Sequence, residues 1–106
     1  MHQVRISDFS RFPYGRYPEH GPFNGQRFRQ EFLLPSFISG GEVCVDLSGA
    51  RGLSPSFLEE AFGGLVRSGL TPQDVLARLV VRGERDQTVV QTIQRYVREA
   101  GERVTH

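Results

Sequence analysis

Three stretches of the chain have the residue pattern of β-strands. Polar and apolar residues alternate over residues 3–7, with Val4 and Ile6 on one side, and this period of two predicts a short strand. Residues 42–47 form a nearly continuous β-rich run around Val43 and Val45, which predicts the central strand of a sheet. A further strand is predicted over residues 79–82.

A helical pattern follows a loop-rich stretch near the N-terminus. The prolines and glycines of residues 8–23 predict turns, with at most a short edge hairpin over residues 11–17. Asn24 can cap a helix over residues 25–34, because its side chain can accept from the free N–H groups of the first turn. Phe28 and Phe32 lie four residues apart and give this helix one buried face. Pro35 is expected to stop it.

The most informative segment is the loop and helix that follow the central strand. Ser54 can act as the N-cap, with Pro55 at the first helical position, where its missing N–H costs nothing. Ser56 and Glu59 equally have the spacing of a capping box. Apolar residues then recur at spacings of three and four, and Gly69 is expected to end the helix.

Two more helical segments complete the pattern. A short helix is predicted after Thr71, before the strand at residues 79–82. The last helix, over residues 87–100, buries a face that includes Ile93 and Val97, and Gly101 is expected to terminate it. Strands that alternate with helices predict an α/β domain, in which helices pack on a mostly parallel sheet through right-handed crossovers.

Composition narrows the class of protein. A chain of 106 residues has room for one domain, and a net charge of +1 creates no strong field of either sign. One cysteine allows no internal disulfide and favours a cytoplasmic location. Apolar runs fall far short of the roughly 20 residues that cross a bilayer, and the first residues do not have the pattern of a secretory signal.

No set of residues in the sequence predicts catalysis. His2, His20 and His106 have no paired spacing, so no metal site is expected. The glycines at 49 and 52 follow a strand and precede a helix, but they match no phosphate-binding motif. We therefore expect that the protein is not an enzyme and that it needs no cofactor.

Aromatic residues and arginines are interleaved through the first 37 residues. The aromatics can anchor a loop-rich segment to the core while the arginines face water, or the segment can form a protein interface. It can also bind single-stranded nucleic acid through stacking and charge. For this nucleic-acid alternative the candidate residues are Arg11, Arg16, Tyr17, Arg27 and Arg29.

Residues 41–65 resemble a known family. The sequences VCVDLSG at residues 43–49 and GLSPSFLEEAF at residues 52–62 are similar to the STAS-like family of unknown function, named after the sulfate transporter and anti-sigma factor antagonist domain. The sequences GRY at 15–17, GP at 21–22 and GQRFR at 25–29 resemble it as well. The resemblance implies one STAS-like domain over residues 1–106, with a mixed, mostly parallel sheet of about four strands and three to four helices. Residues 1–37 would form an N-terminal segment and first helix, and residues 38–106 a βαβα core.

The resemblance also implies a regulatory function. In anti-sigma factor antagonists the corresponding loop carries an Asp-Ser-Ser-Gly motif, whose first serine is phosphorylated by a partner kinase related to histidine-kinase ATPases. Ser54, Pro55, Ser56 and Phe57 occupy the four motif positions here. Pro55 has no hydroxyl, so Ser54 and Ser56 stay as candidate phosphoacceptors, although their spacing favours a capping role.

The leading hypothesis is a bacterial regulatory domain that binds a protein partner through residues 53–62. The partner would be an ATPase of the histidine-kinase type or a sigma-factor regulator. The candidate partner-binding residues are Arg51, Leu53, Ser54, Ser56, Phe57, Glu59 and Glu60.

Overall fold

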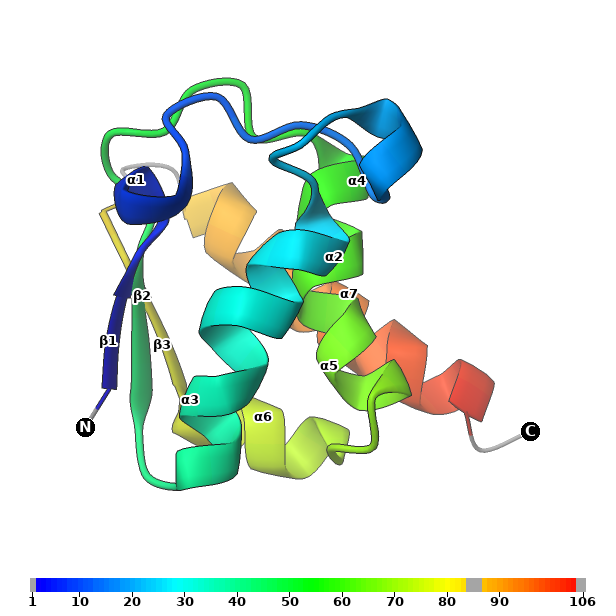
Figure 1. Ribbon diagram of the computed structural model, residues 1–106. Coiled ribbons are helices and arrows are strands. Elements are labelled where there is room, and N and C mark those ends of the chain that lie inside the picture. The colour runs from blue at the N-terminus through cyan, green and yellow to red at the C-terminus, as the bar shows by residue number, and fades with distance from the viewer. Residues whose placement is uncertain (1, 84–86, 105–106) are drawn as a thin grey trace.

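The computed structural model describes residues 2–83 and 87–104, and its strands form one parallel sheet (Figure 1). The strands are β1 (His2–Arg5), β2 (Val43–Asp46) and β3 (Leu79–Arg82), in the order β1-β2-β3. The predicted α/β class is confirmed. The described residues form three strands where about four were expected, and both pairings are parallel, so this part of the sheet is not mixed.

β2 is the central strand, as its apolar run predicts. Val45 is fully buried and lies opposite Val4 of β1, which places apolar side chains of neighbouring strands on the same face of the sheet. The same register brings Arg5, Asp46 and Arg82 side by side where the three strands end. Charged residues therefore gather at the carboxyl end of the sheet.

The first long helix continues through the proline that was expected to end it. It comprises α2 (Gly25–Phe28), the π-helical turn η2 (Arg29–Leu33) and α3 (Leu34–Ser39). Within the π turn the N–H of Leu34 donates to the carbonyl of Arg29, so the ladder has already shifted register where Pro35 offers no N–H. Pro35 is the second residue of α3, where a missing donor is tolerated, and the predicted stop is wrong.

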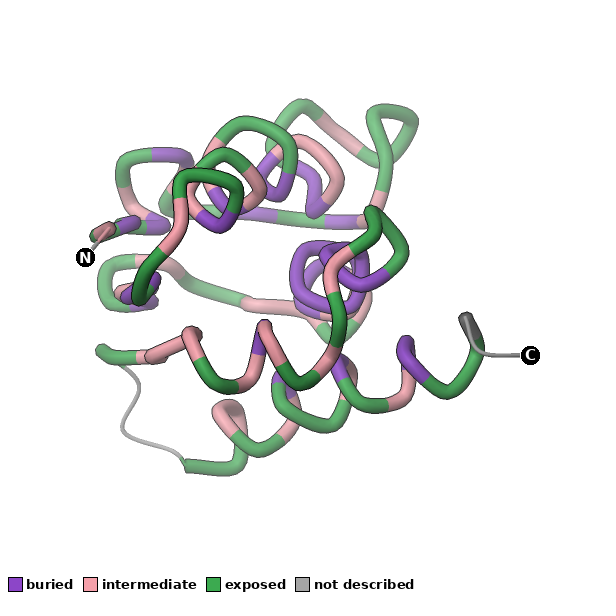
Figure 2. The backbone as a smooth tube through the Cα atoms, turned by 90° about the horizontal axis from the view of Figure 1, so that it is seen from below, coloured by how far each residue is buried: buried purple, intermediate pink, exposed green. Residues whose placement is uncertain are grey.

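The second long helix is the centre of the molecule. It comprises α4 (Pro55–Leu58), the π-helical turn η3 (Glu59–Gly63) and α5 (Gly64–Arg67). Every residue from Glu60 to Val66 is buried, and this helix is the continuously purple coil in Figure 2. Helices that are buried on all sides are packed within a core. Gly69 follows with a φ of 115°, which confirms the predicted end.

The C-terminal part holds α6 (Pro72–Arg78) and α7 (Gln87–Val104). α6 begins after Thr71, as predicted, and the Thr71 hydroxyl caps it by accepting from the N–H of Asp74. α7 continues through Gly101. That residue is buried, and a β-carbon there would overlap the ring of Pro72. Gly101 permits close packing of α7 against α6, so its predicted role as terminator is wrong.

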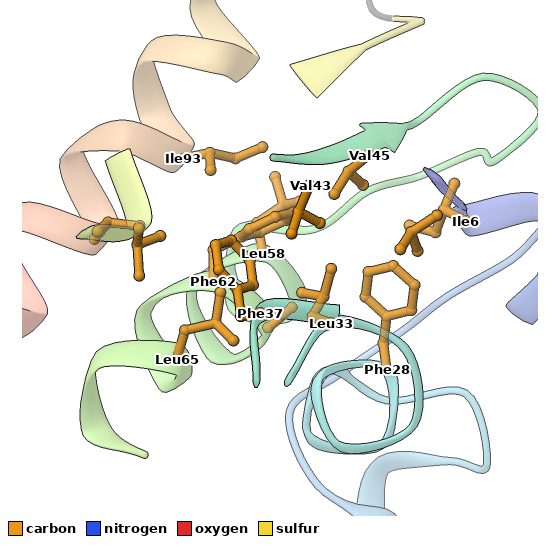
Figure 3. Packing of buried hydrophobic residues seen from close by; sticks show 14 of the residues in the cluster. Ile6, Phe28, Leu33, Phe37, Val43, Val45, Leu58, Phe62, Leu65 and Ile93 are labelled. Carbon is orange, nitrogen blue, oxygen red and sulfur yellow. The ribbon is translucent and has the colours of Figure 1, made fainter. Parts of the chain in front are cut away.

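The N-terminal segment belongs to the same core as the rest of the chain. β1 pairs with β2, the short helix α1 (Ile6–Phe9) follows it, and Ile6 and Phe28 are fully buried. Figure 3 shows both side chains packed in the cluster that also holds Val45 and Phe62. The expected division after residue 37 therefore marks no structural boundary. With contiguous segments joined, and besides the short 3-10 helix η1 (Pro18–His20), the described residues form five helices, one or two more than expected.

Candidate functional site

Two loops meet at the carboxyl end of the sheet and form a surface that we call the loop face, residues 10–17 and 47–56. The N–H of Arg51 donates to the carbonyl of Arg11 at 2.8 Å, and the loops run side by side at the top of Figure 1. The first loop is also held by α2, since the carbonyls of Gly15 and Arg16 accept from the start of that helix. No strand forms over residues 11–17, so the edge hairpin is absent from this described segment.

The loop face presents large side chains to solvent. Phe12 is 69% exposed and Tyr14 is 64% exposed, although most phenylalanines of the chain are buried or half-buried. Arg11 and Arg51 are exposed beside them. Exposed aromatic and arginine side chains are enriched where proteins bind one another, and here they stand on loops that backbone hydrogen bonds hold in place.

The predicted partner-binding residues divide between surface and core. Arg51 is exposed, and Leu53, Ser54, Ser56 and Glu59 are half-buried. Phe57 is fully buried and Glu60 is 4% exposed. These two residues hold the helix in the core and offer a partner no contact area, because their helix begins at the loop face and immediately enters the protein interior.

Ser54 has the structural role that its position predicts. Its Oγ accepts from the N–H of Phe57 at 3.3 Å, and Pro55 occupies the first helical position. Ser56 lies inside the helix, with its hydroxyl 3.3 Å from that of Ser54, so the alternative capping box from Ser56 to Glu59 does not form. Phosphorylation of either serine stays a prediction.

A cluster of five charged residues lies beneath the loop face, where the helix α2–η2–α3 crosses the helix α4–η3–α5. These are the two long helices referred to below. Arg29 is 7% exposed and donates from Nη1 to Oε2 of Glu60 and to the Glu60 carbonyl, both at 2.6 Å. Arg16 and Arg67 both pair with Glu59. We call Arg16, Arg29, Glu59, Glu60 and Arg67 the ion-pair cluster.

The π turns and two glycines make room for the ion-pair cluster. A β-carbon at Gly64 would overlap Nη1 of Arg29, and one at Gly63 would come within 2.5 Å of Oε2 of Glu59. Partial burial opposes ionisation of Glu59, but hydrogen bonds from Arg67 and Arg16 outweigh it and hold the pKa of Glu59 below its ordinary value. The cluster is therefore a charged crossing point that fixes one helix against the other.

We did not predict this cluster from the sequence, because its ion pairs between the two helices join residues that are distant along the chain. Arg29 and Glu60 are 31 residues apart, and nothing local predicts that they meet. One signal was present: two adjacent glycines inside a helical pattern are unfavourable unless something approaches the backbone closely. Gly63 and Gly64 mark that approach.

The arginines of the nucleic-acid alternative are largely used within the protein. Arg16 and Arg29 belong to the ion-pair cluster, and Arg27 pairs with Glu31 at 2.9 Å while stacking on Phe9 and Phe23. Arg11 and Tyr17 remain exposed. The alternative is left with less unpaired charge than the composition of the segment indicates.

Two hollows open on the loop face. One, of about 730 Å³, lies between α1 and the loop after β2 and is lined by both exposed arginines, Arg11 and Arg51. The other, of about 430 Å³, lies between Arg16, Ser56 and the residues of α7 around Tyr96. Among residues 2–83 and 87–104, no three His, Cys, Asp or Glu side chains converge as a metal site would require. In the same ranges no helix is long and apolar enough to span a bilayer.

The geometry defines a small α/β domain in which a surface with exposed aromatic and arginine side chains lies at the carboxyl end of a parallel sheet. Comparison with family models matches residues 24–89, more than half of the chain, to the STAS-like domain of unknown function (DUF4325). The chain belongs to this family. The match covers the two long helices, β2, β3 and the second loop of the loop face. No curated protein and no solved structure matches the chain.

Proposed function

We propose that this STAS-like domain is a non-enzymatic regulatory module that binds a partner protein through the loop face. The observation that carries the proposal is the exposure of Phe12, at 69%, beside Arg51 on loops joined by a backbone hydrogen bond. Burial of one phenylalanine side chain contributes about 1.5–3 kcal/mol to association. Phenylalanine and arginine are both enriched where proteins bind one another.

The first candidate partner is an ATPase of the histidine-kinase type, and the second is a sigma-factor regulator. Both come from the resemblance of the loop and following helix to anti-sigma factor antagonists, which act in the cytoplasm. The loop after β2 provides Arg51, Leu53 and Ser54 as contacts, and the first turn of α4 provides Ser56. Glu59 contributes through its ion pair with Arg16, which fixes the neighbouring loop.

Binding through the loop face is favoured over nucleic-acid binding. Arg16, Arg27 and Arg29 already pair with carboxylates of this chain, and binding phosphates would require breaking those pairs. Loss of affinity on Phe12 substitution without a steep salt dependence would support a protein partner, since phosphate contacts give a steep salt slope.

The test compares two exposed apolar residues at opposite ends of the molecule. Phe12→Ala removes the aromatic side chain of the loop face, and Ile38→Ala removes an equally exposed side chain, at 72%, from α3. Purified ATPases of the histidine-kinase type and sigma-factor regulators from the source genome are titrated with the full chain by biolayer interferometry. We expect Phe12→Ala to weaken binding by about tenfold or more and Ile38→Ala to have no effect. Equal affinity of wild type and Phe12→Ala for every partner that binds would refute the proposed surface.

A further inference from the structure

The larger hollow of the loop face is lined by hydrogen-bond donors and positive charge. It has a volume of about 730 Å³ and lies where β1 and β2 end. Its walls come from α1, the first loop and the loop after β2, and they include Ser7, Arg11, Phe12, Ser48, Gly49 and Arg51. Ligands of parallel α/β sheets bind beyond the carboxyl ends of the strands, so the hollow has the position of a ligand site.

The two arginines of this hollow differ from three of the other four arginines among residues 1–53. Arg16, Arg27 and Arg29 each pair with a carboxylate, whereas Arg11 and Arg51 have no ion-pair partner within the described ranges. Among the described residues, no carboxylate lines the hollow. The hydrogen bond between Arg51 N–H and the Arg11 carbonyl holds the two backbones together, and both residues line the same hollow.

The carboxylate of Asp46, at the end of β2, already accepts hydrogen bonds from its own loop. Asp46 accepts from the N–H of Ser48 at 2.9 Å and from its hydroxyl at 2.6 Å. These bonds lower the pKa of Asp46 and keep it ionised. They also fix Ser48 and position Gly49, which has a φ of 86° and whose N–H has no acceptor in the described part of the chain. The loop is therefore organised before any ligand arrives.

We propose that this hollow binds a phosphate monoester. Arginine presents a planar set of donors that matches phosphate oxygens, and two such groups with the hydroxyl of Ser7 and the N–H of Gly49 suit a tetrahedral dianion better than a planar carboxylate. Phe12, at the rim, offers a ring on which an aromatic group of the ligand can stack. The site would exist whether or not the loop face binds a protein partner, so the inference goes beyond the proposed function.

The test is a titration of the full chain in which binding is monitored by amide ¹H–¹⁵N NMR spectra. Phenyl phosphate is the main probe, with phenol as the uncharged control and inorganic phosphate as the control without a ring. We expect saturable shifts of the Gly49 and Arg51 amides with phenyl phosphate, weaker binding of inorganic phosphate and no shifts with phenol. Shifts that stay linear, or that fall on α7 instead, would overturn the proposal.

Two charge-removal variants and a matched control make the assignment specific. Arg11→Gln and Arg51→Gln should each raise the dissociation constant by about tenfold, because each removes a charge-assisted hydrogen bond. Arg98→Gln removes an exposed arginine of α7, away from the hollow, and should change the constant by less than about twofold. An equal loss in all three variants would show general charge attraction and would overturn the site.

Two further probes identify the source of the phosphate. AMP represents a free nucleotide, and a phosphotyrosine peptide represents a modified partner protein. Tighter binding of either one supports the site and names its source, whereas failure of both, together with failure of phenyl phosphate, refutes it. Because no partner protein is present in these titrations, their failure would leave the Phe12 test of the proposed function unaffected.

Discussion

Removal of the Glu60 carboxylate charge tests whether the ion-pair cluster holds the two long helices together. The change is Glu60→Gln, which keeps the size of the side chain and leaves the Arg29 guanidinium buried without its counter-charge. Arg29 is 7% exposed and Glu60 is 4% exposed, so neither charge is screened well by water. The Nε of Arg29 is buried and unpartnered among the described residues, so the guanidinium has little other compensation.

The magnitude follows from what remains after the substitution. Breaking a buried pair by removing one partner costs about 3–5 kcal/mol. Arg29 also donates to the backbone carbonyl of Glu60, and that bond survives, so the lower end applies. We expect the free energy of unfolding to fall by about 3 kcal/mol. With a urea m-value of about 1.5 kcal/mol/M, the midpoint of urea unfolding should fall by about 2 M.

The assay is urea unfolding followed by circular dichroism, with a matched control on the surface. Glu31→Gln breaks the ion pair with Arg27. The side chains of Glu31 and Arg27 are 50% and 42% exposed, so the free energy of unfolding should fall by less than about 0.5 kcal/mol. A double variant, Arg29→Met with Glu60→Met, should recover most of the loss, because a buried pair can be replaced by apolar residues of similar size. A loss below about 1 kcal/mol in Glu60→Gln would refute the reasoning.

Three further perturbations follow from the same contacts. Ser54→Ala should cost about 1 kcal/mol by removing the N-cap of α4, measured by thermal unfolding, while Ser56→Ala should cost clearly less. Gly64→Ala should lower the free energy of unfolding by about 1–3 kcal/mol in the same assay, since its β-carbon overlaps Arg29; an unchanged melting temperature would contradict this packing. Because the folded pKa of Glu59 lies below its ordinary value of 4.5, its ion pairs stabilise the fold above that pH and are lost as pH falls through the folded pKa. Urea midpoints measured between pH 7 and pH 3 should therefore fall less steeply in Glu59→Gln, and identical slopes would exclude this contribution.

The buried ion pair also changes how the partner surface can be tested. Charge reversal at Glu59 and Glu60, two of the candidate partner-binding residues, does not separate loss of binding from loss of folding. Glu60 lies in the core against Arg29, so its reversal would place two positive charges together away from water. Exposed residues such as Phe12 separate binding from folding, and Glu60 does not.

Features that depend on neighbours in the sequence were predictable. The strand around Val45 and the caps at Asn24, Ser54 and Thr71 are local patterns, and all four form. A cap needs only a side-chain oxygen three residues before an N–H, so the sequence contains the whole interaction. The family resemblance at residues 41–65 rests on the same local pattern, and it is confirmed.

Features that depend on contacts between distant segments were not predictable. The end expected at Gly101 failed because Pro72, almost thirty residues earlier, packs against that glycine. The stop expected at Pro35 failed because the π turn before it shifts the hydrogen-bond register. Gly101 is accepted within α7 because of tertiary packing, and Pro35 is accepted within its helix because of the π turn before it. Intrinsic propensity alone could not reveal either outcome.

The loop face and the ion-pair cluster are connected through α4 and through Arg16. Ser54 starts α4 at the loop face, and the same helix enters the cluster at Glu59 and Glu60 within two turns. Arg16 links the cluster back to the first loop, whose Arg11 is bonded to the second. A ligand or partner that moves either loop therefore has to act against the crossing point of the two long helices. Binding at the loop face should accordingly raise the midpoint of urea unfolding of the wild type. The increase should be smaller in Glu59→Gln, where the link to Arg16 is weakened.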